Sequence, residues 1–289
     1  PHCSAVYCSP HMSLNHSPSR TNAEESQAAY PASSQSVARS ATNSSSSHAQ
    51  DRSKKLLAIF AHPDDEQSIG PLLVKSVEEG VEVTLVIATD GRLGVNEYTD
   101  YEAGDGLAAI RRAEMQCAAE VLGVNLIHLD YHDQLKAAEG FDGHIPHVQS
   151  LILELKEIIT ETAPDAIITW GPDGATTHMD HRLVGASVTQ VFVSQLWDQP
   201  MDLFYFGIPK DLLPSPKAKT LRGQDPSYLT TRISFSEAHY NQAYKALLCH
   251  KSQYPAEVVA QIKKERTQWG NTIYLRQFAI PEKGRVSLF

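Results

Sequence analysis

Three groups of polar residues in this chain have the types and spacing that could bind a metal ion and hydrolyse a bond. They are Ala61-His62-Pro63-Asp64-Asp65-Glu66, Thr89-Asp90-Gly91-Arg92, and Asp173-Gly174 followed by His178-Met179-Asp180-His181. A catalytic zinc ion is typically bound by three histidine or carboxylate ligands and keeps a further position open for water. The first and third groups together supply ligands of this kind.

His62 and Asp65 are separated by only two residues, so a tight turn would let both side chains reach one ion. Pro63 stiffens such a turn because its ring fixes the backbone φ angle. His181, near the start of an expected helix, can arrive as the third ligand from a neighbouring loop. We therefore predict a Zn²⁺ site formed by His62, Asp65 and His181, and another divalent transition metal such as Fe²⁺ could occupy the same ligands.

Asp64 and His178 are left without a metal-binding role. Hydrolysis by bound water needs a base for the proton of the water and a donor for the developing oxyanion and the leaving amine. Asp64 suits the first role and His178 the second, and Asp180 could orient His178. The pattern predicts a hydrolase that uses metal-bound water as its nucleophile.

The elements that position these residues alternate along the chain. We expect strands at residues 56–60, 81–88, 124–129 and 165–170, and helices at 66–79, 106–122, 148–162 and 181–196. This alternation predicts an α/β fold, Rossmann-like and doubly wound, with a mostly parallel sheet and helices on both faces. Ligands of such folds bind at the carboxyl ends of the strands, and the polar groups follow strands there.

Residues 54–289 are expected to form a single domain with a less regular C-terminal third. There we expect strands at 202–206 and 231–235, helices at 236–249 and 256–269, and a long exposed loop at about 209–228. Residues 1–53 are rich in Ser, Asn, Ala and Gln and have almost no clustered aliphatic side chains. They predict a disordered tail or an extension foreign to the domain.

Composition excludes several classes of partner. With 25 Lys and Arg against 34 Asp and Glu, the net charge of −9 disfavours nucleic acid and anionic membrane surfaces, which both need a positive field. No apolar run approaches the ~20 residues of a membrane helix, and we find no secretory signal. The four cysteines, at positions 3, 8, 117 and 249, favour a reducing compartment. We therefore expect a cytoplasmic protein without membrane insertion.

The motif Ala61-His62-Pro63-Asp64-Asp65-Glu66, combined with His178-x-Asp180-His181, closely resembles the LmbE-like/PIG-L deacetylase family. The resemblance covers roughly residues 54–200. It includes Thr89-Asp90-Gly91, Arg111-x-x-Glu114 and Leu122-Gly123-Val124, and it continues more weakly into Cys249-His250-Lys251-Ser252-Gln253. Met179 stands where the family often has proline, which affects the stiffness of the loop and not the identity of the ligands.

The resemblance implies zinc bound by His62, Asp65 and His181, with Asp64 as general base. It implies His178 as general acid or oxyanion stabiliser, and Arg111 as a contact to a substrate hydroxyl. The implied reaction removes an acetyl group from the amide nitrogen of an N-acetylglucosamine-type small molecule or glycoconjugate. Homo-oligomers occur in the family, and no interface pattern in this sequence decides the oligomeric state.

Two other functions stay open. One is a metal-dependent amide or ester hydrolase that acts on a non-sugar substrate. The other is a non-catalytic protein that binds a metal or ligand on the same scaffold, although such a protein has no need of the spare Asp64 and His178. Among the neighbouring residues, we expect Glu66 to support the turn at His62 and Asp90 to hold the turn after strand 81–88. For His250, a place in the core or at the surface is the default.

Overall fold

The computed structural model describes residues 52–136, 147–213, 221–266 and 270–278. The chain divides into two units, Pro1–Arg52 and Ser53–Phe289. All the elements described below belong to the second unit. The tail expected at residues 1–53 lies almost entirely outside the described residues, so its disorder stays a prediction.

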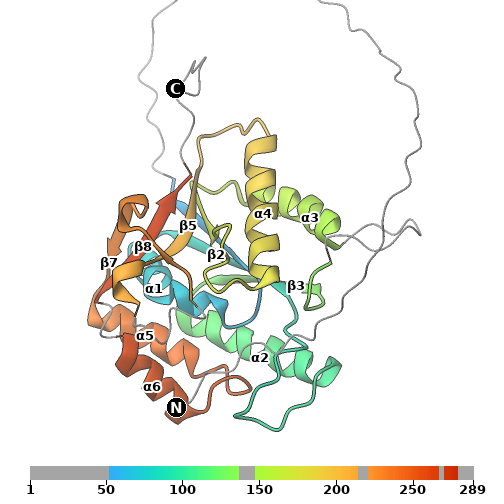
Figure 1. The fold of residues 1–289 in the computed structure, drawn as a ribbon. Helices are drawn as coiled ribbons and strands as arrows, with labels where there is room; N and C mark the ends of the chain where they lie inside the picture. The colour runs from blue at the N-terminus through green and yellow to red at the C-terminus, as the bar shows by residue number, and fades with distance from the viewer. Residues whose placement is uncertain (1–51, 137–146, 214–220, 267–269, 279–289) are drawn as a thin grey trace, which may run out of the picture. The chain divides into compact units, whose positions relative to one another are not determined.

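Five parallel strands form the centre of one mixed sheet (Figure 1). In spatial order they are β3 (Asn125–Tyr131), β2 (Glu82–Thr89), β1 (Lys55–Phe60), β4 (Ala166–Trp170) and β5 (Asp202–Pro209). β8 (Thr272–Gln277) pairs antiparallel with β5, β7 (Thr231–Ser234) pairs antiparallel with β8, and the short β6 (Gly223–Gln224) pairs with the end of β5. The predicted α/β fold with a mostly parallel sheet is confirmed.

Helices cover both faces of this sheet (Figure 1). α3 (His147–Thr162) and α4 (Met179–Ser194) pack together on one face. On the other face, α1 (Gly70–Glu78) and α2 (Asp105–Leu122) pack against α5 (Glu237–Leu247), and α6 (Ala256–Arg266) contacts α5. β1 and β2, which lie between the two layers, are almost continuously buried, as is typical of parallel strands with both faces covered.

Two helix starts differ from the prediction. The helix expected at 66–79 is split into a 3-10 turn, η1 (Asp65–Ser68), and α1, because Pro71 sits in the first turn of α1 and favours a helix start there. α4 starts two residues before the expected His181, with His178 as its N-cap. The second shift matters for the site, because it places His178 and His181 on the same helix terminus.

The C-terminal third contains one strand that was not predicted, β8, and short elements within the segment that was predicted to be a loop. β8 was missed because only Ile273 and Leu275 are buried in it, too weak an alternation to stand out. The segment expected as a loop at 209–228 contains η2 (Lys210–Leu212), β6 and η4 (Pro226–Tyr228). Residues 214–220 of that segment lie outside the described residues.

Cys117 of α2 and Cys249, just after α5, form a disulfide across 132 residues of sequence, with Cα atoms 5.9 Å apart. This differs from the reducing compartment that the few cysteines suggested, since disulfides persist mainly in oxidising compartments. The pair was not visible in the sequence because it depends on α2 packing against α5.

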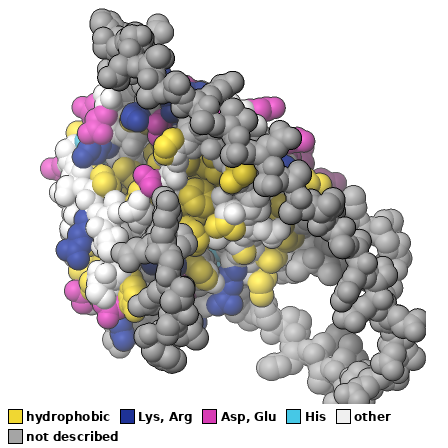
Figure 2. Space-filling model, turned by 90° about the horizontal axis from the view of Figure 1, so that it is seen from above, with side chains coloured by type: hydrophobic (Ala, Val, Ile, Leu, Met, Phe, Trp, Pro, Cys, Tyr) yellow, Lys and Arg dark blue, Asp and Glu magenta, His cyan; other side chains and the backbone are white. Residues whose placement is uncertain are grey.

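Two surface properties concern partners. Among the residues that the structure describes, no helix has the length and apolarity to cross a membrane. Hydrophobic side chains gather on the face at which α4 ends (Figure 2), and Val193 and Leu196 near that end are exposed. This face lies at the opposite end of α4 from His178 and His181.

Candidate metal centre and catalytic site

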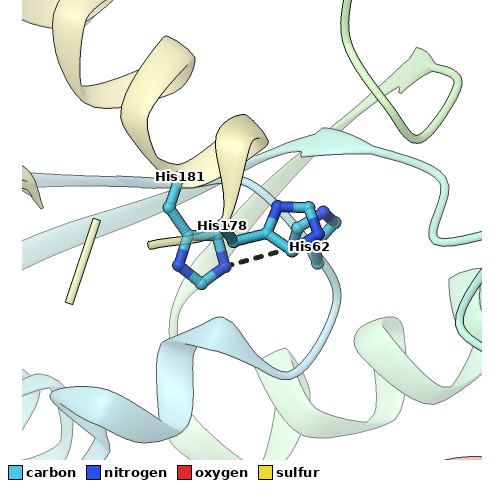
Figure 3. Close-up of side chains that lie close together, drawn as sticks. All are labelled: His62, His178 and His181. Carbon is cyan, nitrogen blue, oxygen red and sulfur yellow. Dashed lines mark hydrogen bonds between the residues drawn. The ribbon is translucent and has the colours of Figure 1, made fainter. Parts of the chain in front are cut away.

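The predicted site residues meet where the strand order reverses. β1 is flanked by β2 on one side and by β4 on the other, and ligands of doubly wound sheets bind at the carboxyl ends of strands at such a point. His62 comes from the loop after β1, and His178 and His181 come from the start of α4, which follows β4 (Figure 3).

The turn after β1 is held by its own carboxylates. Asp65 Oδ2 accepts hydrogen bonds from the backbone N–H groups of Ala61 (3.0 Å) and His62 (2.8 Å). Glu66 Oε2 accepts a hydrogen bond from the backbone N–H of Asp64 at 3.0 Å. Asp64 itself has a left-handed backbone with φ of 98°, which a non-glycine residue keeps only where its surroundings enforce it. The role expected for Glu66 is therefore confirmed.

The three predicted ligands converge on one point. His62 Nδ1 lies 3.2 Å from His181 Nε2, and His181 Nε2 lies 3.2 Å from Asp65 Oδ1. His62 Nδ1 lies 3.6 Å from Asp65 Oδ2. The Trp170 ring stacks on the His181 imidazole with centroids 4.3 Å apart, which fixes the plane of that ligand. Two imidazole nitrogens and a carboxylate oxygen are a donor set that suits zinc.

The second ring nitrogen of His62 and that of His181 have different hydrogen-bond partners. His62 Nε2 lies 3.1 Å from Asp180 Oδ2, and His181 Nδ1 lies 2.8 Å from the carbonyl oxygen of Gly174. When these nitrogens carry the ring protons, His62 Nδ1 and His181 Nε2 present their lone pairs to the shared point. Metal-binding histidines commonly have this arrangement.

Two groups of ligand atoms among the described residues, neither of which contains Asp65, have all their atoms within 4.8 Å of one another and could hold a metal ion. One is His62 with His178 and His181, and the other is His62 with Asp133 and Asp180. We favour Asp65 over His178 as the third ligand, because its carboxylate adds the negative charge that a cation needs. His178 Nδ1 already accepts a hydrogen bond from the backbone N–H of Asp180.

The charges of the site are strongly coupled. Burial lowers the pKa of His62, but hydrogen bonds to Asp180 and Asp65 and the charge of Asp65 outweigh burial and raise this pKa to about 10. Burial also acts to raise the pKa of Asp65, but the charge and hydrogen bond of His181, together with those of His62, hold it well below its ordinary value. The proton on His62 thus balances carboxylate charge that a bound cation would balance instead.

The Asp64 carboxylate is held from two sides. Arg111 Nη2 lies 3.3 Å from Oδ1, and the Tyr254 hydroxyl donates a hydrogen bond of 2.9 Å to Oδ2. Burial raises the pKa of Asp64, and the positive charge of Arg111 works against this rise. A buried carboxylate with a raised pKa, beside a group of metal-binding atoms, has the properties of a general base.

His178 is the N-cap of α4, and its ring meets the His62 ring edge to face at 4.5 Å. Burial and the charge of His181 lower the pKa of His178 to about 4. Since its Nδ1 accepts the Asp180 N–H bond at 3.1 Å, the neutral ring carries its proton on Nε2. Of the two roles implied for His178, this arrangement favours donation to an oxyanion over transfer of a proton.

Asp180 and Arg111 lie near the site, but with partners other than those expected. The Asp180 carboxylate is 4.0 Å from His178 Nδ1 and closer to His62, and it also accepts a hydrogen bond from the Leu135 N–H. Arg111 is 3% exposed, and its guanidinium donates to the carbonyl oxygens of Pro63 and Gly91. The contact between Arg111 and a substrate hydroxyl stays a prediction.

Two residues after α5, His250 and Tyr254, contact the turn that carries Asp64. His250 was considered in the sequence analysis, but Tyr254 was not. Tyr254 was missed in the sequence, although it directly follows the segment 249–253 in which the family resemblance weakens. His250 is fully buried and lies 2.7 Å from Glu66 Oε1, so it supports the turn at Asp64 from within the core.

Residues 57–192 match the family described as "PIG-L: GlcNAc-PI de-N-acetylase". A relative from Corynebacterium glutamicum, a 1D-myo-inositol 2-acetamido-2-deoxy-alpha-D-glucopyranoside deacetylase, is 32% identical over 44% of this chain and 49% of its own length. The diacetylchitobiose deacetylase of Thermococcus kodakarensis is 33% identical over 46% of each chain. The chain thus spans about half the length of these curated relatives.

The fold has counterparts among solved structures. The N,N'-diacetylchitobiose deacetylase from Pyrococcus horikoshii superposes with a TM-score of 0.60 and 23% identity, over 78% of this chain and 84% of the other. At this identity the likeness concerns the fold. The matched residues 57–192 contain His62, Asp64, Asp65, His178 and His181, so the segment that is similar to the PIG-L (LmbE-like) deacetylases includes all five of these predicted site residues.

Proposed function

We propose that this protein is a zinc-dependent hydrolase that removes the acetyl group from the amide nitrogen of an N-acetylglucosamine-type small molecule or glycoconjugate. The observation that carries the proposal is the convergence of His62 Nδ1, His181 Nε2 and Asp65 Oδ1, with pairwise separations of 3.2 Å about His181 Nε2, beside the Asp64 carboxylate. The names of the relatives, which are deacetylases of amino-sugar compounds, support the substrate class.

In this proposal His62, Asp65 and His181 hold the metal. Zinc bound there would lower the pKa of a water ligand to about 7 and polarise the acyl oxygen. Fe²⁺ is an alternative occupant, since imidazole and carboxylate ligands also suit it. The hydrogen bonds of Asp180 to His62 and of Gly174 to His181 keep both rings oriented for this task.

Asp64 is the proposed base. Its carboxylate takes a proton from the attacking water, and the proton passes to the amide nitrogen as the carbon–nitrogen bond breaks, so that acetate and a free amine are produced. The raised pKa of Asp64 favours the first half of this transfer, because a stronger base accepts the proton from water more readily. Arg111 and Tyr254 keep the carboxylate at one orientation.

His178 is the proposed donor to the oxyanion. Its Nε2–H, on the nitrogen opposite the Nδ1 that accepts the Asp180 N–H bond, can stabilise the negative charge that develops on the acyl oxygen. A neutral imidazole serves this purpose without a change of protonation. In this proposal Asp64 therefore transfers the protons, and His178 stabilises the negative charge on the acyl oxygen.

Hydrolysis of a non-sugar amide or ester stays the second candidate function, because the same metal ligands, Asp64 and His178 would perform it. Homo-oligomerisation and a cytoplasmic location also stay predictions. The disulfide between Cys117 and Cys249 argues against a reducing cytoplasm.

The test is release of acetate from N-acetylglucosamine, diacetylchitobiose, an N-acetylglucosaminyl inositol, an N-acetyl amino acid and an aryl acetate. Each compound is incubated with zinc-loaded protein, with chelator-stripped protein and with the Asp64→Asn variant. Release from the sugars by the zinc-loaded wild type alone supports the proposal. Release from only the amino acid or ester would favour the second candidate, and no release from any compound would count against both.

A further inference from the structure

The segment Cys249–Tyr254, which follows α5, contacts the turn after β1, helix α2 and the loop after β2. His250 pairs with Glu66 at 2.7 Å, and the Ser252 backbone N–H and hydroxyl donate to the Glu114 carboxylate of α2 at 2.7 and 2.6 Å. Gln253 donates to the Gly94 carbonyl oxygen at 2.7 Å. Cys249 anchors the start of the segment to α2 through the disulfide. Tyr254 is thereby held at a fixed position relative to the turn after β1.

The hydrogen-bond direction at Tyr254 is determined by its neighbours. The Gln67 side-chain amide donates to the Tyr254 hydroxyl oxygen at 3.2 Å. A phenol has one hydrogen to donate, and the remaining partner is Asp64 Oδ2, an acceptor 2.9 Å away. The Tyr254 hydrogen therefore points at the Asp64 carboxylate.

The Asp64 side chain needs such a partner, because Asp64 does not lie in a regular helix or strand that would fix the direction of its carboxylate. Its φ of 98° is unfavourable for a residue with a Cβ atom, and η1, which begins at the next residue, receives no cap from its side chain. Arg111 fixes one carboxylate oxygen and Tyr254 fixes the other. With one of these contacts removed, the carboxylate can rotate about its side-chain bonds.

We propose that Tyr254 is a positioning residue for the general base Asp64, acting through its hydroxyl and oriented by Gln67. This inference rests on the proposed function. Tyr254 touches neither a predicted metal ligand nor the point at which His62, Asp65 and His181 converge. Its removal should therefore slow turnover without weakening metal binding.

The experiment compares the wild type with Tyr254→Phe, which keeps the ring and removes only the hydroxyl. We expect kcat for acetate release to fall about tenfold or more, while KM changes less than twofold and zinc stoichiometry is unchanged. Tyr228→Phe is the matched control, because Tyr228 is 65% exposed. A Tyr254→Phe enzyme with unchanged kcat would overturn the proposal, and so would a loss of kcat that follows a loss of zinc.

The Gln67→Met variant tests whether Gln67 influences Asp64 through the Tyr254 hydroxyl. The backbone N–H of Gln67 also donates to the Asp64 carbonyl oxygen at 3.3 Å, and methionine keeps that bond. Because the Gln67 side chain reaches Asp64 through the Tyr254 phenol, its replacement should lower kcat in the wild type and have no further effect in Tyr254→Phe. Independent, multiplicative losses would contradict the proposed coupling.

A crystallographic comparison separates this inference from the proposed function. In Tyr254→Phe the Asp64 carboxylate should adopt a new or a second orientation, and an unchanged single orientation would overturn the positioning role. This readout holds even if the wild type hydrolyses no amide, an outcome that would count against the proposed function alone.

Discussion

The Asp180 carboxylate lies 3.1 Å from Nε2 of His62, at the ring nitrogen opposite the one that faces His181. Asp180 is fully buried and holds a second hydrogen bond from the Leu135 backbone at 2.8 Å. The pair is a carboxylate–histidine arrangement of the kind that orients metal ligands and raises their basicity. Asp180 is therefore placed to act on the proposed metal centre through His62.

From this pair we predict that Asp180→Asn weakens zinc binding about 10- to 100-fold, the usual cost of losing such a partner. The asparagine keeps the volume of the side chain and the Leu135 contact but removes the charge. Zinc affinity is measured by competition with a chromophoric chelator. The exposed Asp198→Asn is the control, and equal affinities of the two variants would show that Asp180 does not tune His62.

Zinc binding should release a proton from His62. With its pKa raised to about 10, the metal-free imidazole is protonated near pH 7, whereas a metal ligand must be neutral. Affinity should therefore rise as the pH increases toward this pKa and fall as the pH decreases. Calorimetry in two buffers with different ionisation enthalpies gives the number of protons released. A binding enthalpy independent of the buffer would contradict this prediction.

Asp64→Asn should retain zinc and lose about 10²- to 10⁴-fold in kcat, the usual contribution of a general base. His181→Ala should instead lose the metal, because it removes a ligand. Metal analysis together with acetate release distinguishes the two effects. Near-normal turnover of Asp64→Asn would exclude Asp64 as base, and full zinc stoichiometry in His181→Ala would show that the ligand set is wrong.

His178→Gln should be markedly more active than His178→Ala. The glutamine amide can present an N–H near the position of His178 Nε2, and a neutral donor is all that the oxyanion role requires. For the alanine variant we expect a loss of about 10²- to 10³-fold in kcat. If His178 transferred a proton, glutamine would be as inactive as alanine, so equal rates would decide against the neutral donor.

Removal of the disulfide by the double change Cys117→Ser and Cys249→Ser should lower the free energy of unfolding by about 2–4 kcal/mol. The bond joins residues 132 positions apart, so it restricts the unfolded chain over a long loop. Urea denaturation with and without reductant measures the change. Reductant should destabilise the wild type and leave the double variant unaffected, and a wild type insensitive to reductant would argue that the bond does not form.

The parts of the site that could be predicted from the sequence are local in the chain. His62 to Glu66 directly follow the apolar strand β1, and His178 to His181 follow β4 by a short loop, so strand prediction placed both groups at one sheet edge. The contact between Asp180 and His62 joins residues 118 positions apart, and the contact between Tyr254 and Asp64 joins residues 190 positions apart. Such pairs depend on how helices and loops pack, which local pattern does not encode.

The Cys117–Cys249 bond also closes a covalent ring of backbone that contains α3, β4 and α4. His178 and His181 lie inside this ring, whereas His62 and Asp65 lie on the chain before it. A protease that cut one peptide bond between the two cysteines would leave both fragments attached to each other. Such a nicked protein would migrate as one species until a reductant was added, so clipping inside the ring would not by itself release His181 from the fragment that carries His62 and Asp65.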